Sequence, residues 1–147
     1  MALVVFLLLV AAAAWSGSRF QPGEWYAQLQ KPAWTPPNWL FPVAWGVLYL
    51  MIAIAGWFVW RGGGLSLALV IWTVQLCINA AWSWLFFGRH LMRAALADII
   101  LLWLAIIAFI FASWPLSQAA AVLFVPYLLW VSFAALLNWR IVRLNAV

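Results

Sequence analysis

The sequence has few of the residues that carry hydrolytic or metal chemistry. Glu24 and Asp98 are the only acids in 147 residues, and the chain has a single cysteine, Cys77, and a single histidine, His90. One cysteine excludes an intrachain disulfide, and one histidine supplies neither a metal cluster nor a histidine-based triad. The glycine run "RGGG" at 61–64 lacks the Lys-Ser/Thr pair of a phosphate-binding loop. These absences argue against a conventional hydrolase or metalloenzyme.

What the chain has in abundance is apolar surface. Apolar residues make up 71% of the sequence and charged residues only 6%, which is far outside the composition of a soluble domain. The apolar runs are continuous, whereas a membrane barrel shows short segments of alternating polarity. We therefore predict an all-α integral membrane protein, a single domain over residues 1–147 built as a five-transmembrane-helix bundle. Runs long enough to span a bilayer lie at about 1–18, 40–60, 65–87, 91–113 and 117–140.

The first run, "MALVVFLLLVAAAAW", has two interpretations. Its apolar stretch followed by alanines is compatible with a cleavable signal peptide. Signal peptides, however, normally begin with basic residues, and no Lys or Arg precedes this stretch. We expect it to be the first membrane helix.

Basic residues are distributed unevenly between the two ends of the predicted bundle. Arg61 alone falls on one side, and the other side holds Arg19, Lys31, Arg89, Arg93, Arg140 and Arg143. Because short loops rich in Lys and Arg stay in the cytoplasm, this asymmetry predicts an outside N-terminus and a cytoplasmic C-terminus in a bacterial inner membrane. An outer membrane remains the alternative. The net charge of +5 is thus a signal of topology and of contact with anionic lipid, and not of nucleic-acid binding.

The first connection, about 19–39, is much longer than the other three. It contains "KPAWTPPNW", and its tryptophans and prolines favour an ordered segment over a disordered one. We expect a short helix in "GEWYAQLQ", ended by Pro32, and then an extended approach to the second span. This partly ordered first loop is predicted to cap one end of the bundle.

Polar and aromatic residues within the spans recur at steps of three and four, so they share helix faces. Because polar groups are costly in lipid, we expect these faces to point inward and to line one aromatic pocket. The predicted inward stripes are Trp45, Tyr49, Ile52 and Gly56; Trp72, Gln75, Asn79, Trp82 and Phe86; Ala94, Asp98 and Ala105; and Tyr127, Trp130, Ala134, Leu137 or Asn138, and Ile141.

The tryptophans and polar residues of the spans also have structural interpretations that involve no ligand. Tryptophans form belts at membrane interfaces, which suits those near span ends: Trp15, Trp57, Trp60, Trp84, Trp114 and Trp139. The amides Gln75, Asn79 and Asn138 are equally compatible with hydrogen bonds between helices. Asp98 is compatible with pairing to Arg93 or with capping its helix.

Four segments together resemble the TspO/MBR family, which comprises translocator proteins and tryptophan-rich sensory proteins. They are "GSRFQPGEWYAQLQKPAWTPPNWLFPVAWGVLY" at 17–49, "QLCINAAWSWLFFG" at 75–88, "ALADIILLW" around Asp98, and "LFVPYLLWVSFAALLN" at 123–138. The resemblance implies a five-helix bundle that binds porphyrins, chiefly protoporphyrin IX or haem-type tetrapyrroles, as ligands rather than as required cofactors. It also implies sterol or lipid ligands, synthetic isoquinoline carboxamide or benzodiazepine ligands, and a homodimer.

The resemblance further assigns roles to individual residues. Trp45 and Trp130 match positions linked to light-dependent porphyrin breakdown, so any enzymatic activity is expected to be photochemical and secondary to binding or transport. The complete set of candidate ligand-binding residues is Trp34, Pro36, Pro37, Trp39, Leu40, Trp45, Tyr49, Gln75, Asn79, Trp82, Asp98, Tyr127, Trp130, Ala134, Leu137 and Asn138. Within it, Trp34, Pro36, Pro37 and Trp39 are the expected lid.

Two positions depart from the family pattern. In "LLNWRIVR", Trp139 stands where the family's sterol-recognition segment has a tyrosine, and such lipid-recognition patterns are weak even when intact. Ala94 stands where some members have a tryptophan. We therefore expect tetrapyrrole binding ahead of sterol binding, and altered selectivity toward synthetic ligands.

Overall fold

The computed structural model describes residues 2–20 and 22–145, and within these residues all the regular structure is helical. Its helices are α1 (Ala2–Arg19), α2 (Glu24–Ala27), α3 (Leu40–Gly63), α4 (Leu67–Ser83), the π-helix η1 (Trp84–Gly88), α5 (Met92–Ser113) and α6 (Gln118–Leu144). With α4 and η1 taken as one span, five helices are long and apolar enough to cross a membrane. The predicted fold class is confirmed.

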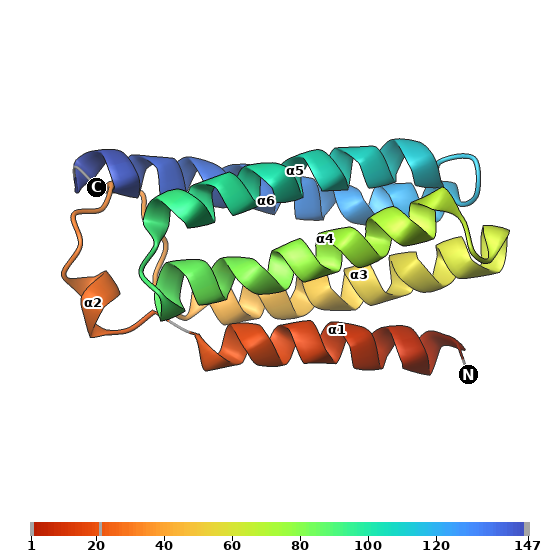
Figure 1. The fold of residues 1–147 in the computed structure, drawn as a ribbon, viewed down its shortest axis with the longest axis horizontal. Helices are drawn as coiled ribbons and strands as arrows, with labels where there is room; N and C mark the ends of the chain where they lie inside the picture. Colours follow the sequence, from red (N-terminus) through yellow and green to blue (C-terminus); the bar gives the residue numbers. More distant parts are fainter. Residues whose placement is uncertain (1, 21, 146–147) are drawn as a thin grey trace.

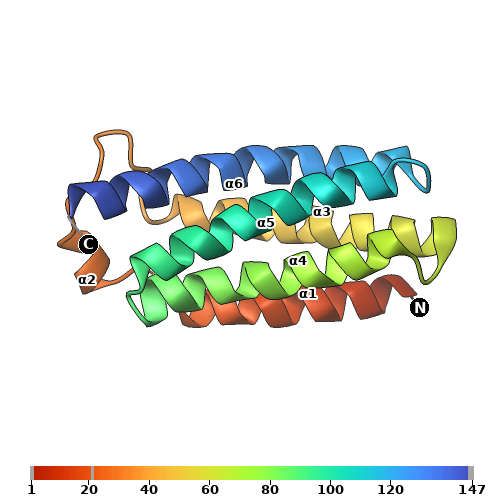
Figure 2. The ribbon, with the colours of Figure 1, turned by 45° about the horizontal axis from the view of Figure 1, so that its top comes forward.

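The five spans run side by side along the long axis of the molecule (Figures 1 and 2). α5 packs against α4 and α6, and α1 packs against α3 and α4. The two chain ends lie at opposite ends of the bundle, and α2 lies at the same end as the C-terminus (Figure 1). The first loop therefore lies at the end of the bundle where α1, η1 and α6 finish.

The last turn of the third span is a π-helix rather than an α-helix. The Arg89 N–H donates to the Trp84 carbonyl at 2.8 Å, a hydrogen bond that spans five residues. Single π-turns of this kind interrupt α-helices and often occur at functional sites. The wider turn lets consecutive residues, Phe86 and Phe87, both face the interior, where both line one cavity.

Three of the four predicted inward stripes are confirmed as interior faces. On α4 and η1 all five members of the stripe are buried, and on α3 and α6 the members are buried or half-buried. The stripe on α5 was wrong. Ala94 is exposed and Asp98 is only half-buried, whereas the buried face of this helix consists of Met92, Ala95, Ile99, Leu102, Ile106 and Phe109.

The physical reason for this error lies in the composition of α5. Lipid-facing residues are as apolar as core residues, so an almost wholly apolar helix carries no contrast that marks its inner face. Asp98 was the only polar guide within the span, and it lies at the edge of the buried face rather than at its centre. The short helix expected in "GEWYAQLQ" is present as α2, but it ends at Ala27, several residues before Pro32.

Close packing between α3 and α4 depends on a glycine. The Trp72 indole N–H donates to the Ile52 carbonyl at 2.9 Å, and the edge of the Phe6 ring meets this indole at 5.1 Å. A Cβ at Gly56 would lie 2.6 Å from the Trp72 ring and 2.8 Å from the Phe6 ring. Only glycine leaves room for both rings and for the hydrogen bond.

We therefore predict that Gly56→Ala lowers the free energy of unfolding by about 1–3 kcal/mol, because Trp72 must shift and lose its bond to Ile52. Thermal unfolding in detergent measures the change. Gly46→Ala on the same helix is the matched control, because a Cβ at Gly46 meets nothing within 4 Å. Equal effects of the two substitutions would contradict the role assigned to Gly56.

Candidate functional site: an aromatic compartment under the first loop

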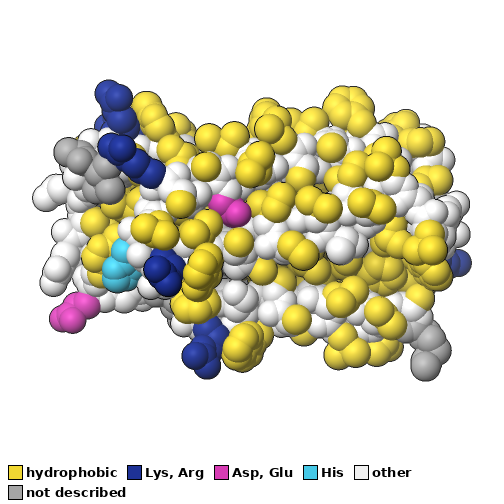
Figure 3. Space-filling view, in the orientation of Figure 1, with side chains coloured by type: hydrophobic (Ala, Val, Ile, Leu, Met, Phe, Trp, Pro, Cys, Tyr) yellow, Lys and Arg dark blue, Asp and Glu magenta, His cyan; other side chains and the backbone are white. Residues whose placement is uncertain are grey.

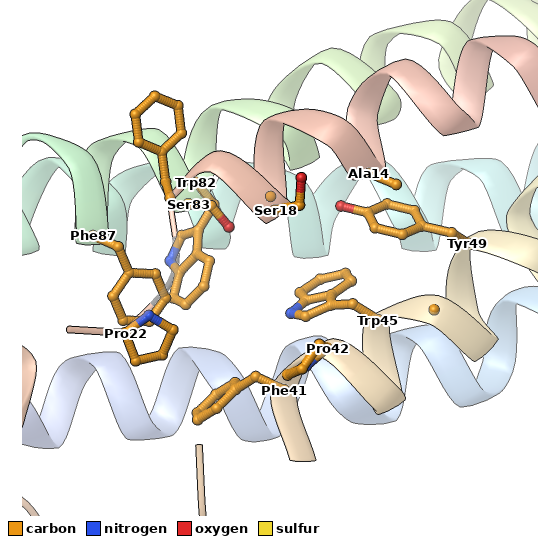
Figure 4. A pocket seen from close by; sticks show the side chains of 13 residues that line it. Ala14, Ser18, Pro22, Phe41, Pro42, Trp45, Tyr49, Trp82, Ser83 and Phe87 are labelled. Carbon is orange, nitrogen blue, oxygen red and sulfur yellow. The ribbon is translucent and has the colours of Figure 1, made fainter. Parts of the chain in front are cut away.

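The larger candidate site is a cavity of about 200 Å³ between α1, α3 and α4, close to the end covered by the first loop. Trp82 and Phe87 lie at one end of it, Tyr49 and Ala14 lie at the other, and Trp45 projects between them (Figure 4). Its lining is almost entirely apolar and aromatic, with Ser18 and Ser83 as small polar groups. Such walls suit a flat hydrophobic ligand.

A second, much smaller cavity of about 10 Å³ lies toward α6. Its walls include Tyr26 from α2, Phe86 from η1, and Ala134 and Leu137 from α6. Phe41, Trp82 and Phe87 line both cavities. These three rings are therefore a partition between two halves of one compartment.

Trp45 is the centre of the aromatic cluster in this compartment. Its ring is stacked on Tyr49 with a centroid separation of 5.6 Å, and it meets Tyr127 and Trp130 edge to face at 6.3 Å each. The Trp130 indole N–H is buried and has no hydrogen-bond partner among the described residues. An unpaired buried donor is costly in a native protein, so Trp130 is a candidate to bind an acceptor group on a ligand.

A relay of hydrogen bonds fixes the rotation of three helices around this cluster. Tyr49 on α3 donates to Asn79 Oδ1 at 2.8 Å, and Asn79 Nδ2 donates to the Tyr127 hydroxyl at 2.7 Å. Tyr127 on α6 in turn donates to Gln75 Oε1 at 2.8 Å. Asn79 and Gln75 both belong to α4. The structural interpretation of these two amides, as interhelical hydrogen-bonding groups, is confirmed.

Asn138 makes a second polar connection. Its Oδ1 accepts a hydrogen bond from the Trp82 indole N–H at 3.0 Å, and its Nδ2 donates to the Met92 carbonyl at 3.0 Å. Asn138 thereby joins α6 to α4 and to the first turn of α5. It also fixes the Trp82 ring, which separates the two cavities.

Contacts with residues just after η1 and just after α6 hold the first loop against the bundle. Trp25 is stacked on His90, 3.9 Å between ring centroids and 6° from parallel. The Gln30 backbone makes two hydrogen bonds with the Asn145 side chain, at 3.0 and 2.9 Å. Lys31 Nζ donates to the Tyr26 carbonyl at 2.7 Å and lies 4.7 Å from the centre of the Tyr26 ring.

Positive charge gathers at this same end of the molecule. Most of the visible Lys and Arg side chains lie in the half of the molecule that holds the C-terminus, while the rest of the visible face is dominated by apolar side chains (Figure 3). Several of these cations lie over tryptophan rings: Arg19 over Trp15, Arg89 over Trp84, and Arg140 and Arg143 on Trp139. Six of the seven Lys and Arg residues therefore lie at the end of the bundle that holds the first loop, and Arg61 alone lies at the other end.

A model of the TspO/MBR family matches residues 3–144. The chain belongs to this family. A tryptophan-rich sensory protein from Cereibacter sphaeroides is 41% identical, with 97% of this chain and 90% of the relative aligned. Protein CrtK from Rhodobacter capsulatus is 39% identical over 96% of this chain and 91% of its own length. The human translocator protein is 40% identical over 95% and 88%, respectively. Membership and the five apolar helices together make the chain an integral, multi-pass membrane protein.

Only some of the candidate ligand-binding residues predicted from the sequence line the two cavities. Trp45, Tyr49 and Trp82 line the larger cavity, and Trp82, Ala134, Leu137 and Asn138 line the smaller one. The residues that line neither are Trp34, Pro36, Pro37, Trp39, Leu40, Gln75, Asn79, Asp98, Tyr127 and Trp130. Of these, Trp130 and Tyr127 still contact Trp45 directly.

The two tryptophans of the expected lid, Trp34 and Trp39, differ in their contacts with the bundle. Trp34 meets the Phe133 ring of α6 at 5.6 Å, so it anchors the loop to the bundle. Trp39 is 65% exposed.

Asp98 on α5 has one carboxylate oxygen that is buried and without a hydrogen-bond partner among the described residues.

Sequence reasoning missed four aromatic residues that line the cavities: Phe20, Tyr26, Phe41 and Phe87. Phe86 was placed on an inward face, but its neighbour Phe87 was not, because an α-helical period cannot turn two consecutive residues to one side. The signal that could have found Phe87 is the aromatic run "WLFFG" at 84–88, directly before a predicted turn.

We predict that Asn145→Ala loosens the first loop of this family member, because it removes both hydrogen bonds to Gln30. Amide hydrogen exchange in residues 24–34 should accelerate by about tenfold, since two bonds of about 0.5–1.5 kcal/mol each are lost. Gln28→Ala is the matched control, because Gln28 is exposed in the same loop. Unchanged exchange in Asn145→Ala would show that the aromatic contacts alone hold the loop.

Proposed function

We propose that the protein binds porphyrins, protoporphyrin IX-type tetrapyrroles, in the aromatic compartment beneath the first loop. The observation that carries this proposal is the arrangement around Trp45, where four aromatic rings converge beside a cavity at the positively charged end of the bundle. A porphyrin is a flat aromatic ring that carries two carboxylates. Its ring matches the indole and phenol walls, and its carboxylates match the cations near the first loop.

Binding requires the compartment to open. Its larger cavity holds about 200 Å³, whereas sites for drug-sized ligands typically hold about 300–1,000 Å³. Rotation of Phe41 and Phe87 would join the two cavities, because these rings separate them. Neither ring makes a polar contact, so their movement costs packing but no hydrogen bond.

Light-dependent breakdown of the bound porphyrin is the second part of the proposal. An indole in contact with the photoexcited ring donates one electron to it, leaving an indole radical cation and a porphyrin radical anion; dioxygen is the oxidant for breakdown of the ring. Trp45 and Trp130 lie 6.3 Å apart, centroid to centroid. Trp45 lines the larger cavity, and Trp130 is in contact with Trp45, so the two indoles form a pair of electron donors beside a ring bound in the compartment. Sensing and transport remain the alternative uses of the same binding event.

We predict saturable quenching of tryptophan fluorescence when protoporphyrin IX is added to detergent-purified protein. Under illumination in air, the complex should bleach faster than free porphyrin, and Trp45→Phe combined with Trp130→Phe should remove that excess. Trp114→Phe is the matched control, because this exposed indole lies at the far end of α5. Quenching that never saturates would contradict the binding proposal. Stronger binding of a sterol than of porphyrin, retained in the double variant, would favour a sterol or lipid carrier instead.

We also propose that the end carrying the first loop faces the cytoplasm of a bacterial inner membrane, with the N-terminus outside. The support is the charge asymmetry: Arg61 lies at the opposite end of the bundle from the other Lys and Arg residues, and cytoplasmic loops are the ones enriched in these residues. The homodimer implied by the resemblance stays a prediction.

Protease protection tests the orientation. In sealed spheroplasts, a tag on the N-terminus should be cleaved by external protease, and a tag on the C-terminus should be protected until the membrane is opened. The two tags serve as controls for each other. An external C-terminal tag would reverse the proposed orientation.

A further inference from the structure

Tyr26 is a buried residue on α2 whose hydroxyl has no hydrogen-bond partner among the described residues. The residue is only 2% exposed. Its ring is packed edge-on against Phe41 at 6.4 Å, Phe86 at 6.1 Å and Phe87 at 5.3 Å. Burial without a partner costs stability, so a hydroxyl retained in such a place calls for a function.

Tyr26 is one of the residues that line the smaller cavity. Two other lining residues, Trp82 and Asn138, also carry polar groups. Trp82 and Asn138 hydrogen-bond to each other, and Asn138 also binds the Met92 carbonyl. Of these three side chains, Tyr26 is the one whose polar group has no hydrogen-bond partner within residues 2–20 and 22–145.

We propose that the Tyr26 hydroxyl donates a hydrogen bond to a carboxylate of the bound ligand and so positions its acidic edge beneath α2. The inference rests on the proposed function, because it assigns a recognition residue within the same compartment. It specifies the ligand class further, as a flat aromatic molecule with at least one ionised acid group.

The surroundings favour an anion over a neutral or cationic group. Lys31 Nζ lies 4.7 Å from the centre of the Tyr26 ring, and Glu24 is the only acid in the first loop. Burial raises the pKa of Tyr26 to about 12, so its proton stays in place at physiological pH. Hydrogen bonds to an ionised acceptor are also roughly twice as strong as those between neutral groups.

Phe41 connects this hydroxyl with the rest of the compartment. Its ring lies between Tyr26, at 6.4 Å, and Trp130, at 6.1 Å, and it lines both cavities. Among the described residues, Tyr26 and Trp130 are the two aromatic side chains with unpaired buried donors. A ligand that displaces Phe41 therefore comes beside two residues that each carry such a donor.

Tyr26→Phe tests the proposal, because it removes only the hydroxyl and keeps the ring that packs against the phenylalanines. The affinity for protoporphyrin IX, measured by tryptophan quenching, should fall by about tenfold, as expected for a lost bond to a charged acceptor. The affinity for protoporphyrin IX dimethyl ester should fall by about threefold or less, because its acceptors are neutral.

Stability supplies a second measurement that does not depend on any ligand. Tyr26→Phe should leave the melting temperature of the ligand-free protein unchanged or raise it, because the variant no longer buries an unpaired hydroxyl. Tyr49→Phe is the comparison, and it should lower the melting temperature because the Tyr49 hydroxyl is bonded to Asn79. A marked loss of stability in Tyr26→Phe would overturn the proposal by showing that the hydroxyl has a structural partner.

The outcomes separate this inference from the function it rests on. Saturable binding by the wild type with equal affinity in Tyr26→Phe would overturn the role of Tyr26 and leave porphyrin binding intact. Equal losses for the diacid and the ester would overturn the choice of a carboxylate. Absence of saturable binding in the wild type would overturn both proposals, whatever the variant does.

Discussion

The hydrogen-bond relay from Tyr49 through Asn79 and Tyr127 to Gln75 is the constraint on which the rest of the compartment depends. In the hydrocarbon region of a membrane, no water is available to satisfy a polar side chain, so a buried amide or phenol must find a partner on another helix. The relay does this for four side chains at once. It thereby fixes how α3, α4 and α6 are rotated about their axes.

That rotation places the aromatic residues. Trp45 is one turn before Tyr49 on α3, and Trp130 follows Tyr127 by three residues on α6. Because neighbours at steps of three and four share a helix face, orienting the two tyrosines also orients the two indoles. The polar relay therefore fixes the orientation of the helices that carry the aromatic cluster. The indoles of the cluster take no part in the relay, so they remain available to contact a ligand.

The fold was predictable from the sequence because membrane spans follow from length and hydropathy alone. The faces of α3, α4 and α6 were also predictable, since Tyr49, Gln75, Asn79 and Tyr127 mark them with polar groups. The face of α5 was not, because its lipid side and its core side are equally apolar. In the site, residues on regular helices were found, whereas those that depend on irregular backbone were missed. Phe87 needed the π-turn, and Tyr26 needed the docking of α2 against η1 and Phe41.

The contact between Gln30 and Asn145 has a consequence for the order of assembly. These residues are 115 positions apart in the sequence, and their hydrogen bonds join the first loop to the end of the last span. Loop closure over such a distance is costly until the intervening chain is already organised, so long-range contacts of this kind form late. During synthesis the first loop emerges well before Asn145, its partner. The compartment is therefore closed on that side only after α6 has been inserted, which makes the Gln30–Asn145 contact a structural check on insertion of that helix.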